Sequence, residues 1–279
     1  MMTPLKEQFQ KQGFVVIPKA LESSLVQQLI EATDRTLSNE KFSYDLLKIN
    51  KSQHIHKAKY MFEKEEIFLK TLVHDSLLSV ILEFIDDPRA VVPTWEDMLI
   101  KIPNEGIPVT VHQDLALQSV KSNVFSLAVY LHDSHHNPVH YLPGSHNLGH
   151  LTRDAIYEVY QQRKNDFVPL KVNAGDVTVH NVKTVHYSEE NTTPYPRYTW
   201  YLEFRTLSQL IDDSPWDREW ILRRRAIWVS ALKNYKKDRV DLIPDYEDLK
   251  EYMNPLQLRI SHTNEKIQYD MESPYNHFI

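Results

Sequence analysis

The residues most able to perform chemistry lie in the stretch Val109-Thr-Val-His-Gln-Asp114. Side chains two positions apart on a β-strand point to the same face, so His112 and Asp114 would project together while Gln113 points away. One imidazole nitrogen and one carboxylate oxygen can then bind a single metal ion. An HxD triplet is common by chance, so a third ligand is needed before it indicates a site.

A second stretch, Gly175–Ser188, offers His180 and His186 as the third ligand. Ser188 lies two residues beyond His186 and would face the same side of a strand, and Arg197 follows His186 by eleven residues. A strand through His186, a turn and an antiparallel return would bring Arg197 beside the metal. His180 is the alternative ligand, but it has neither a serine two residues later nor the same interval to Arg197. We therefore expect His180 to be structural or to support a ligand.

Two histidines and one carboxylate on one face of an octahedral metal leave three positions open, as in Fe(II) oxygenases. Two of these positions can take a chelating 2-oxo acid, and the third can take O2. The far carboxylate of 2-oxoglutarate then needs a fixed cation, for which arginine supplies a permanently charged, bidentate fork. We therefore predict that Arg197 binds this carboxylate, with a hydrogen bond from Ser188.

Composition narrows the alternatives. The chain has 279 residues, of which 42% are hydrophobic and 25% charged, so it can bury a substantial core. It has no cysteine, which excludes disulfides, thiolate nucleophiles and cysteine-ligated metals. A net charge of −6 gives no reason to expect a nucleic-acid partner. The five glycines form neither GxGxxG nor GxxxxGK, which disfavours dinucleotide and P-loop phosphate binding.

The N-terminal stretch lacks the apolar segment of a signal peptide. No apolar run approaches the length of about 18 residues that a membrane span requires. We therefore expect a cytoplasmic protein with no membrane partner.

Short β-rich runs separated by turn signals dominate the chain from about residue 90 onward, a pattern typical of a sandwich or barrel. The predicted strands are Ala90–Pro93, Met98–Ile102, Val109–His112, Val124–Leu131, Val168–Val172, Val177–Val179, Val182–His186 and Tyr198–Arg205. Helical spacing or start signals predict helices over Leu21–Leu37, Ile67–Ile85 with a break near His74, Thr152–Arg163 and Trp216–Tyr235.

We expect one domain over residues 1–279. It would have a helical N-terminal part to about residue 89, a β core over about 90–206, and a helical or irregular extension over about 207–279.

Together the motifs resemble the phytanoyl-CoA dioxygenase family of Fe(II)/2-oxoglutarate oxygenases. The resemblance runs from Gly13-Phe-Val-Val-Ile-Pro18 to about Phe204. It includes the HQD triplet, Leu142-Pro-Gly-Ser-His146, and the interval from His186 to Arg197. The family implies a double-stranded β-helix, a cupin-like jelly roll that is mainly β with flanking helices.

By motif position, His112, Asp114 and His186 match the family's iron ligands, and Arg197 and Ser188 match its 2-oxoglutarate contacts. Three further positions match residues of the cofactor pocket: Met98, Lys57, and Tyr130, where relatives often have Trp.

Asn137-Pro138 departs from the family's usual Asn-Gly, and the region before the HQD triplet is short. Both places shape the substrate mouth, so a relative's substrate does not carry over.

The resemblance implies a dioxygenase that uses Fe(II), 2-oxoglutarate and O2 to hydroxylate an unactivated C–H bond of a small-molecule metabolite or natural-product intermediate, releasing succinate and CO2. Related halogenases replace the carboxylate with a small residue, so Asp114 favours hydroxylation, while desaturation and cyclisation stay open. The rival hypotheses are a non-catalytic cupin-like metal-binding sensor or scaffold, and a cupin-type metalloenzyme that does not use 2-oxoglutarate. The sequence leaves the oligomeric state open.

Overall fold

The computed structural model describes residues 3–39, 42, 44–49, 52–85, 87–114, 124–213 and 217–252. Its strands are β1 (Phe14–Ile17), β2 (Asp45–Ile49), β3 (Ser52–Lys59), β4 (Val91–Lys101), β5 (Val109–His112), β6 (Phe125–Tyr130), β7 (Val139–Tyr141), β8 (Val168–Leu170), β9 (Val177–Asn181), β10 (His186–Ser188) and β11 (Arg197–Thr206).

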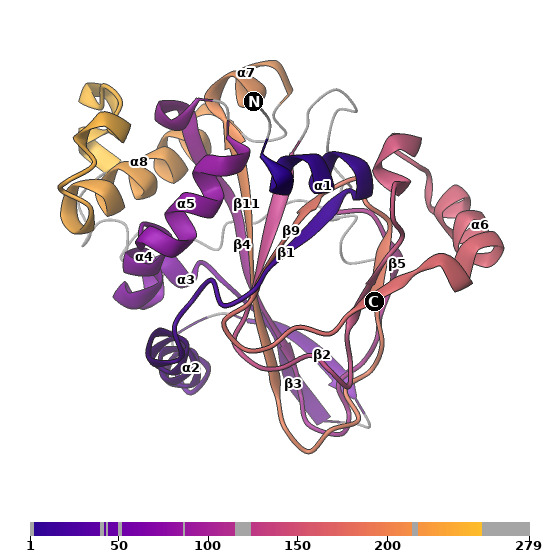
Figure 1. The fold of residues 1–279 in the computed structure, drawn as a ribbon. Coiled ribbons are helices and arrows are strands. Elements are labelled where there is room, and N and C mark those ends of the chain that lie inside the picture. Colours follow the sequence, from indigo (N-terminus) through magenta and orange to yellow (C-terminus); the bar gives the residue numbers. More distant parts are fainter. Residues whose placement is uncertain are drawn as a thin grey trace.

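These strands form two antiparallel sheets (Figure 1). The large sheet has seven strands in the order β1-β9-β6-β11-β4-β3-β2, and the small sheet has four in the order β5-β10-β7-β8. Consecutive strands alternate between the sheets over much of the core, as in a jelly roll. The predicted fold class, a β jelly roll with flanking helices, is confirmed.

The α-helices are α1 (Pro4–Gln12), α2 (Ser23–Leu37), α3 (Met61–Lys64), α4 (Glu66–Leu72), α5 (Asp75–Phe84), α6 (Arg153–Arg163), α7 (Leu207–Asp213) and α8 (Arg218–Tyr235). Single 3-10 turns lie at Pro88–Ala90, Ser145–Leu148, Lys164–Asp166, Val240–Leu242 and Glu247–Tyr252. Helices α3, α4, α5 and α8 cover one face of the large sheet, and α6 lies on the far side of the molecule beside β5 (Figure 1).

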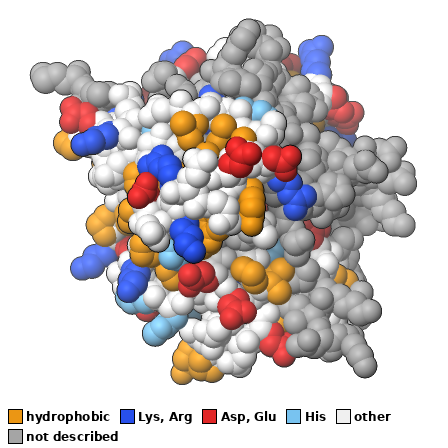
Figure 2. Space-filling model, turned by 90° about the vertical axis from the view of Figure 1, so that its right-hand side faces the viewer, with side chains coloured by type: hydrophobic (Ala, Val, Ile, Leu, Met, Phe, Trp, Pro, Cys, Tyr) orange, Lys and Arg blue, Asp and Glu red, His pale blue; other side chains and the backbone are white. Residues whose placement is uncertain are grey.

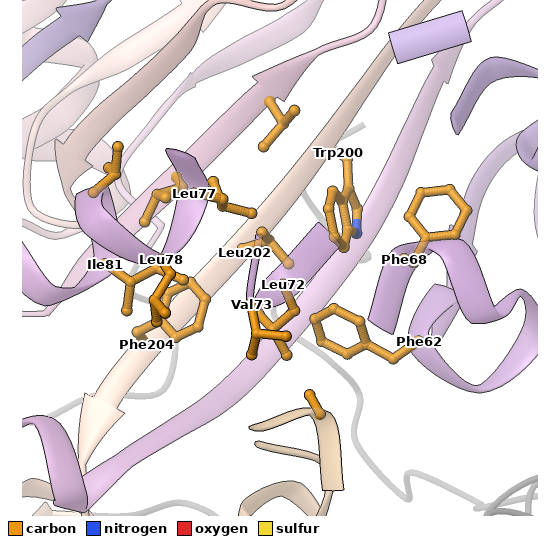
Figure 3. Close-up of a cluster of buried hydrophobic side chains, with 14 of the residues drawn as sticks. Phe62, Phe68, Leu72, Val73, Leu77, Leu78, Ile81, Trp200, Leu202 and Phe204 are labelled. Carbon is orange, nitrogen blue, oxygen red and sulfur yellow. The ribbon is translucent and has the colours of Figure 1, made fainter. Parts of the chain in front are cut away.

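The main hydrophobic core lies between the large sheet and these helices (Figure 3). Trp200 of β11 is fully buried there. The rings of Phe62 and Phe68 meet it edge-on, at centroid distances of 5.5 and 4.9 Å. Because side chains alternate along a strand, burying Trp200 and Leu202 under the helices turns Thr199 and Tyr201 toward the small sheet.

The chain close to its N-terminus is anchored to the β core at Gly13, which ends α1 in a left-handed conformation with φ of 85°. A Cβ at this position would lie 2.5 Å from both Nδ1 of His146 and Oγ1 of Thr184, so only glycine fits without strain. The Gly13 carbonyl accepts hydrogen bonds from Asn181 N and Thr184 Oγ1. The first helix is thereby tied to the loop that precedes His186.

The predicted helices occur at α2, α4, α5, α6 and α8, and the predicted break near His74 separates α4 from α5. The predicted start of the last helix, Trp216, lies outside the described residues, as does the end of the predicted C-terminal extension.

The helical description of the first 89 residues is wrong for one segment, because β2 and β3 form an antiparallel hairpin that extends the large sheet. Its second strand, Ser-Gln-His-Ile-His-Lys-Ala-Lys59, is mostly polar, so it lacks the apolar alternation by which a strand is recognised. The hairpin gains its stability from pairing with β4.

Two predicted strands, Ala90–Pro93 and Met98–Ile102, are one continuous strand, β4. The predicted strand Val182–His186 begins only at its last residue, because Val182–Val185 form the turn between β9 and β10. The strand β7 was not predicted, since its three residues are too few to show a period.

The right-hand side of Figure 1, which carries α6 and β5, presents acidic and basic side chains interspersed over its described part (Figure 2). Among the described residues, no helix combines the length and apolar character that a membrane crossing requires.

Candidate metal and cofactor site

The small sheet brings two of the predicted ligands side by side. His112 at the end of β5 is the direct cross-strand partner of His186 at the start of β10. Their ring centroids lie 4.2 Å apart. Oδ1 of Asp114 lies 3.3 Å from Nε2 of His112 and 3.5 Å from Nε2 of His186. One ligand atom from each of the three residues lies within 4.8 Å of the others, so together they could hold one metal ion.

Backbone contacts orient both imidazoles. Nδ1 of His112 lies 2.7 Å from the Thr110 carbonyl, and Nδ1 of His186 lies 2.9 Å from the Thr184 carbonyl. A carbonyl only accepts, so each Nδ1 carries the proton and each Nε2 presents its lone pair to the space shared with Asp114. A metal-binding histidine needs this tautomer.

Gln113 points away from the triad, as predicted, and fixes the backbone on either side of it. Its amide donates to the carbonyls of Gly149 and Lys183, at 2.9 and 2.7 Å. Its oxygen accepts from Leu151 N at 3.0 Å. The turn that leads to Asp114 is therefore joined to the loop that leads to His186.

His180 approaches the triad from β9 of the large sheet. Its Nε2 lies 2.6 Å from Oδ2 of Asp114, whereas His112 and His186 lie near Oδ1. Its Nδ1 lies 3.3 Å from the hydroxyl of Tyr141. His180 is fully buried. The geometry agrees with the prediction that His180 supports a ligand.

The three histidines around Asp114 keep its carboxylate ionised. Burial alone would raise its pKa, but the imidazoles of His186, His112 and His180 together bring the pKa of Asp114 well below its usual value. Burial, followed by the neighbouring His112, lowers the pKa of His186 to about 3. An ionised carboxylate beside imidazole nitrogens is the donor set that a divalent cation requires.

Arg197 lies at the start of β11, on the large sheet, with only 2% of its surface exposed. Its Nη1 donates to the backbone carbonyl of Asn137 and, at 3.0 Å, to Oδ1 of the same residue. Its Nε and Nη2 are buried and have no hydrogen-bond partner. A buried guanidinium with two free donors fits an incoming carboxylate, the group by which 2-oxoglutarate would be held.

Asn137 is itself held in place. Its Nδ2 donates to Oδ1 of Asn191 at 2.6 Å, and both residues are buried. Asn191 in turn donates to the carbonyls of Ile102 and Tyr195 at 3.1 and 2.8 Å. The dipeptide Asn137-Pro138 differs from the family's usual Asn-Gly only in its second residue. The asparagine that positions Arg197 is therefore present.

β10 and β11 do not pair, contrary to the hairpin that we expected from the spacing of His186 and Arg197. β10 lies in the small sheet and β11 in the large one. Arg197 comes near the small sheet because its side chain crosses to Asn137, two residues before β7. Ser188 is buried on β10 opposite Val139, the first residue of β7, and so lies at the same end of the site.

Tyr130 joins the site face of the large sheet, since it pairs with Thr199 in the register of β6 and β11. It is fully buried. Burial raises the pKa of Tyr130, and the positive charge of Arg197 opposes that rise. The predicted position of Tyr130 beside the cofactor anchor is consistent with these contacts.

Met98 is not brought to the site. It pairs with Trp200 and lies in the core beneath the helices, on the opposite face of β4. Its neighbours Asp97 and Leu99 face the site side instead, because successive residues of a strand point to opposite faces.

Lys57 of β3 pairs with Leu99 and therefore lies on the site face. Its ammonium is 3.8 Å from Oδ2 of Asp97. The structure thus places Lys57 beside the site, two strands away from Thr199, with the Asp97 carboxylate as its ion-pair partner.

Sequence reasoning missed two residues on this face, Tyr201 and Lys101. Tyr201 lies four positions after Arg197 on β11, and its hydroxyl senses the charges of both Arg197 and Asp114. Lys101 pairs with Arg197 across β4 and β11 and donates from Nζ to the Glu189 carbonyl. Burial, followed by the charge of Arg197, lowers the pKa of Lys101 to about 6. The spacing of Tyr201 from Arg197 was the signal available for it in the sequence.

Comparison with protein families identifies the fold family of this chain. The model of the phytanoyl-CoA dioxygenase family (PhyH) matches residues 9–199. A curated protein of Dictyostelium discoideum, a phytanoyl-CoA dioxygenase domain-containing protein 1 homolog, is 38% identical over 77 residues. That match covers 23% of this chain and 27% of the relative, so it spans about a quarter of the relative's length.

Several solved structures share the fold. EctD from S. alaskensis, solved with 2-oxoglutarate and 5-hydroxyectoine, has a TM-score of 0.63 at 19% identity, covering 73% of this chain and 75% of EctD. AviO1 from Streptomyces viridochromogenes Tue57 has a TM-score of 0.58 at 25% identity, covering 73% and 94%. SnoN, a non-heme alpha-ketoglutarate-dependent epimerase from nogalamycin biosynthesis, has a TM-score of 0.60 at 18% identity, covering 72% and 81%.

Proposed function

The chain belongs to the phytanoyl-CoA dioxygenase family, and from that membership we infer its reaction and propose the residues that perform it. It is an Fe(II)- and 2-oxoglutarate-dependent oxygenase. We propose that it hydroxylates a C–H bond of a small molecule, with release of succinate and CO2.

The proposed metal ligands are His112, Asp114 and His186. The donor set supports this assignment, because two imidazole nitrogens and one carboxylate oxygen lie within 4.8 Å of one another. Backbone carbonyls already hold both imidazoles in the tautomer that binds a metal. When bound, Fe(II) and 2-oxoglutarate supply the activation of O2 that no protein side chain can provide.

The observation that best supports the proposal is that two nitrogen atoms of the Arg197 guanidinium have no hydrogen-bond partner. Nε and Nη2 are buried and unpaired, whereas Nη1 is fixed by Asn137. Leaving a charged donor buried without a partner is costly, so the fold tolerates it where a ligand completes the site. We propose that these two donors bind the distal carboxylate of 2-oxoglutarate, with Ser188 and Tyr130 as further contacts.

The same residues would exclude water from one side of the reaction. His112, His186 and Arg197 are at most 9% exposed. The carboxylate side chain of Asp114 is 26% exposed. Substrate is therefore expected to approach from the side of Asp114, while the anchor of the co-substrate stays in the interior.

Hydroxylation is the outcome that we propose because the metal site keeps its carboxylate, which occupies the position a halide would otherwise take. The single-domain organisation over residues 1–279 is likewise a proposal. It is supported by a core cluster that draws on residues from Val15 to Leu249.

The test is succinate release from 2-oxoglutarate by the protein with Fe(II) in air, compared with a sample treated with a chelator. The proposal predicts metal-dependent succinate, which rises when a substrate is present. A chain that binds Fe(II) tightly yet makes no succinate with or without candidate substrates would instead favour a metal-binding sensor or scaffold.

A further inference from the structure

Asp97 is a buried carboxylate on the site face of β4. It pairs with Tyr201 on β11 and with Lys59 on β3. Its neighbour Met98 faces the helices, so alternation along the strand turns Asp97 toward the small sheet. Only 6% of Asp97 is exposed. Two cations of β3 lie beside this carboxylate, Lys57 and Lys59, and Lys59 is already paired with Asp45.

The two oxygens of the Asp97 carboxylate differ in their hydrogen-bond partners. Oδ2 accepts a hydrogen bond from Nε1 of Trp95 at 2.9 Å. The same oxygen lies 3.8 Å from the ammonium of Lys57, beyond hydrogen-bond distance. Oδ1 is buried and has no hydrogen-bond partner. A buried carboxylate oxygen without a donor is strongly destabilising, and a ligand that donates to it would remove that cost.

The residues that surround Asp97 on the site face are partly exposed. Tyr201 lies in the middle of the large sheet, between β6 and β4, and its chain neighbours Trp200 and Leu202 are fully buried. Tyr201 is nevertheless partly exposed, so its exposed surface lies on the side of the small sheet. Trp95 is also partly exposed, and 27% of the surface of the Lys57 side chain is exposed.

Strand β11 links Asp97 to the proposed metal site. Tyr201 is the cross-strand partner of Asp97, and Arg197 lies four residues before Tyr201 on the same face of β11. Burial raises the pKa of the Tyr201 hydroxyl, and the charges of Arg197 and Asp114 act on the same hydroxyl. A molecule that contacts Asp97 would place its neighbouring carbons against Tyr201, close to the oxidising centre.

We propose that Asp97 anchors the prime substrate through a protonated amino group that donates to Oδ1, with the ring of Trp95 packed against the adjacent carbons. An ionised carboxylate only accepts hydrogen bonds, and charge-assisted bonds from a cation are about twice as strong as neutral ones. The inference rests on the proposed function and names its substrate class. That class is a small amine whose reacting C–H bond lies within a few bonds of the nitrogen.

The test uses three fragments that differ in one group: benzylamine, benzyl alcohol and benzoate. Their binding is measured by calorimetry on the protein loaded with Fe(II) and 2-oxoglutarate without O2. Benzylamine is expected to bind at least about tenfold more tightly than the other two, and Asp97→Asn should remove that preference. The matched control is Asp45→Asn, since Asp45 belongs to the same cluster but is 43% exposed and already paired with Lys59 at 2.8 Å.

A second variant works in the opposite direction and guards against misfolding of the first. Lys57→Gln removes the competing cation beside Asp97 and should tighten benzylamine binding by about threefold or more. Equal benzylamine affinity in the wild type and Asp97→Asn, a preference for benzoate, or no saturable benzylamine binding would each overturn the proposal.

Failure of the proposed function is separable from failure of this inference. Binding of 2-oxoglutarate is measured in the same samples before any fragment is added. If the wild type binds no 2-oxoglutarate, the proposed function fails. The dependence of benzylamine binding on Asp97 is then measured on protein to which no 2-oxoglutarate has been added. If 2-oxoglutarate binds and benzylamine does not, only the substrate class is wrong.

Discussion

Nε2 of His180 lies 2.6 Å from Oδ2 of Asp114 and so holds the carboxylate whose other oxygen faces His112 and His186. The contact comes from β9 of the large sheet, whereas the two histidines come from the small sheet. The proposed metal site therefore spans both sheets, and its carboxylate is positioned from the sheet opposite the imidazoles.

Replacing His180 with Ala should weaken metal binding without removing a ligand. Loss of such a supporting hydrogen bond typically reduces metal affinity by about 10- to 100-fold. Replacing His186 should cost more, because a ligand itself is lost. Calorimetric titration with Fe(II) without O2 gives both values, with the exposed His135→Ala as the control. Unchanged affinity in His180→Ala would show that Asp114 needs no support from β9.

Arg197→Ala should reduce the affinity for 2-oxoglutarate while leaving metal affinity intact. Truncating one partner of a buried charge pair costs about 2–5 kcal/mol, which corresponds to at least about 30-fold in dissociation constant. Arg163→Ala is the control, since Arg163 is 41% exposed and pairs with Asp166 at the surface. A loss of less than about threefold would mean that the distal carboxylate is held elsewhere.

Asn137→Ala tests whether Arg197 depends on its anchor. The side chain of Asn137 accepts from Nη1 of Arg197 at 3.0 Å, and a hydrogen bond to a charged group contributes about 1.5–3 kcal/mol. The variant should weaken 2-oxoglutarate binding by at least about tenfold. In the double variant with Arg197→Ala, the two losses should not add, because Asn137 acts through Arg197. Additive losses in this cycle would contradict a positioning role.

The sequence predicted the grouping of His112 and Asp114 from the alternation of a strand, whereas β5 ends at His112 and Asp114 lies two residues beyond it. The sequence also predicted Arg197 at this site, although for a different reason than the one that holds in the structure. The spacing suggested a hairpin with β10, whereas Arg197 reaches the site from the facing sheet. Which strands pair across the two sheets is a long-range property that spacing along the chain does not contain.

The other wrong predictions concern which face of a strand a side chain occupies and which strands pair. Met98 lies in the core beneath the helices, because alternation along β4 turns it to the side of the sheet away from the site. The hairpin of β2 and β3 was missed because its residues carry little apolar alternation, and its position depends on pairing with β4. The buried charge of Asp97 looks like an ordinary surface residue until the burial of β4 is known.

Glu96 provides a test of the fold by pH. It faces the helices, where burial, only partly offset by Arg224 and Phe62 N, raises the pKa of Glu96 to about 8 from 4.5. A raised pKa in the folded state stabilises the protein fully below pH 4.5, and this stabilisation is lost as the pH rises toward about 8. The free energy of unfolding of the wild type should fall relative to Glu96→Gln by up to about 1.4 kcal/mol per pH unit in that window. Urea unfolding at several pH values measures the difference, and a difference that does not change with pH would show that Glu96 is ionised in the folded protein.

The most direct measurement of the central claim is the visible absorption of the protein without O2, after Fe(II) is added and then 2-oxoglutarate. The account predicts a weak metal-to-ligand charge-transfer band that saturates at about one 2-oxoglutarate per chain, because three open positions on the metal allow chelation. His186→Ala should not develop it. A wild-type protein that shows no band, or a His186→Ala variant that shows the same band at the same concentration, would contradict the assignment of the metal and cofactor site.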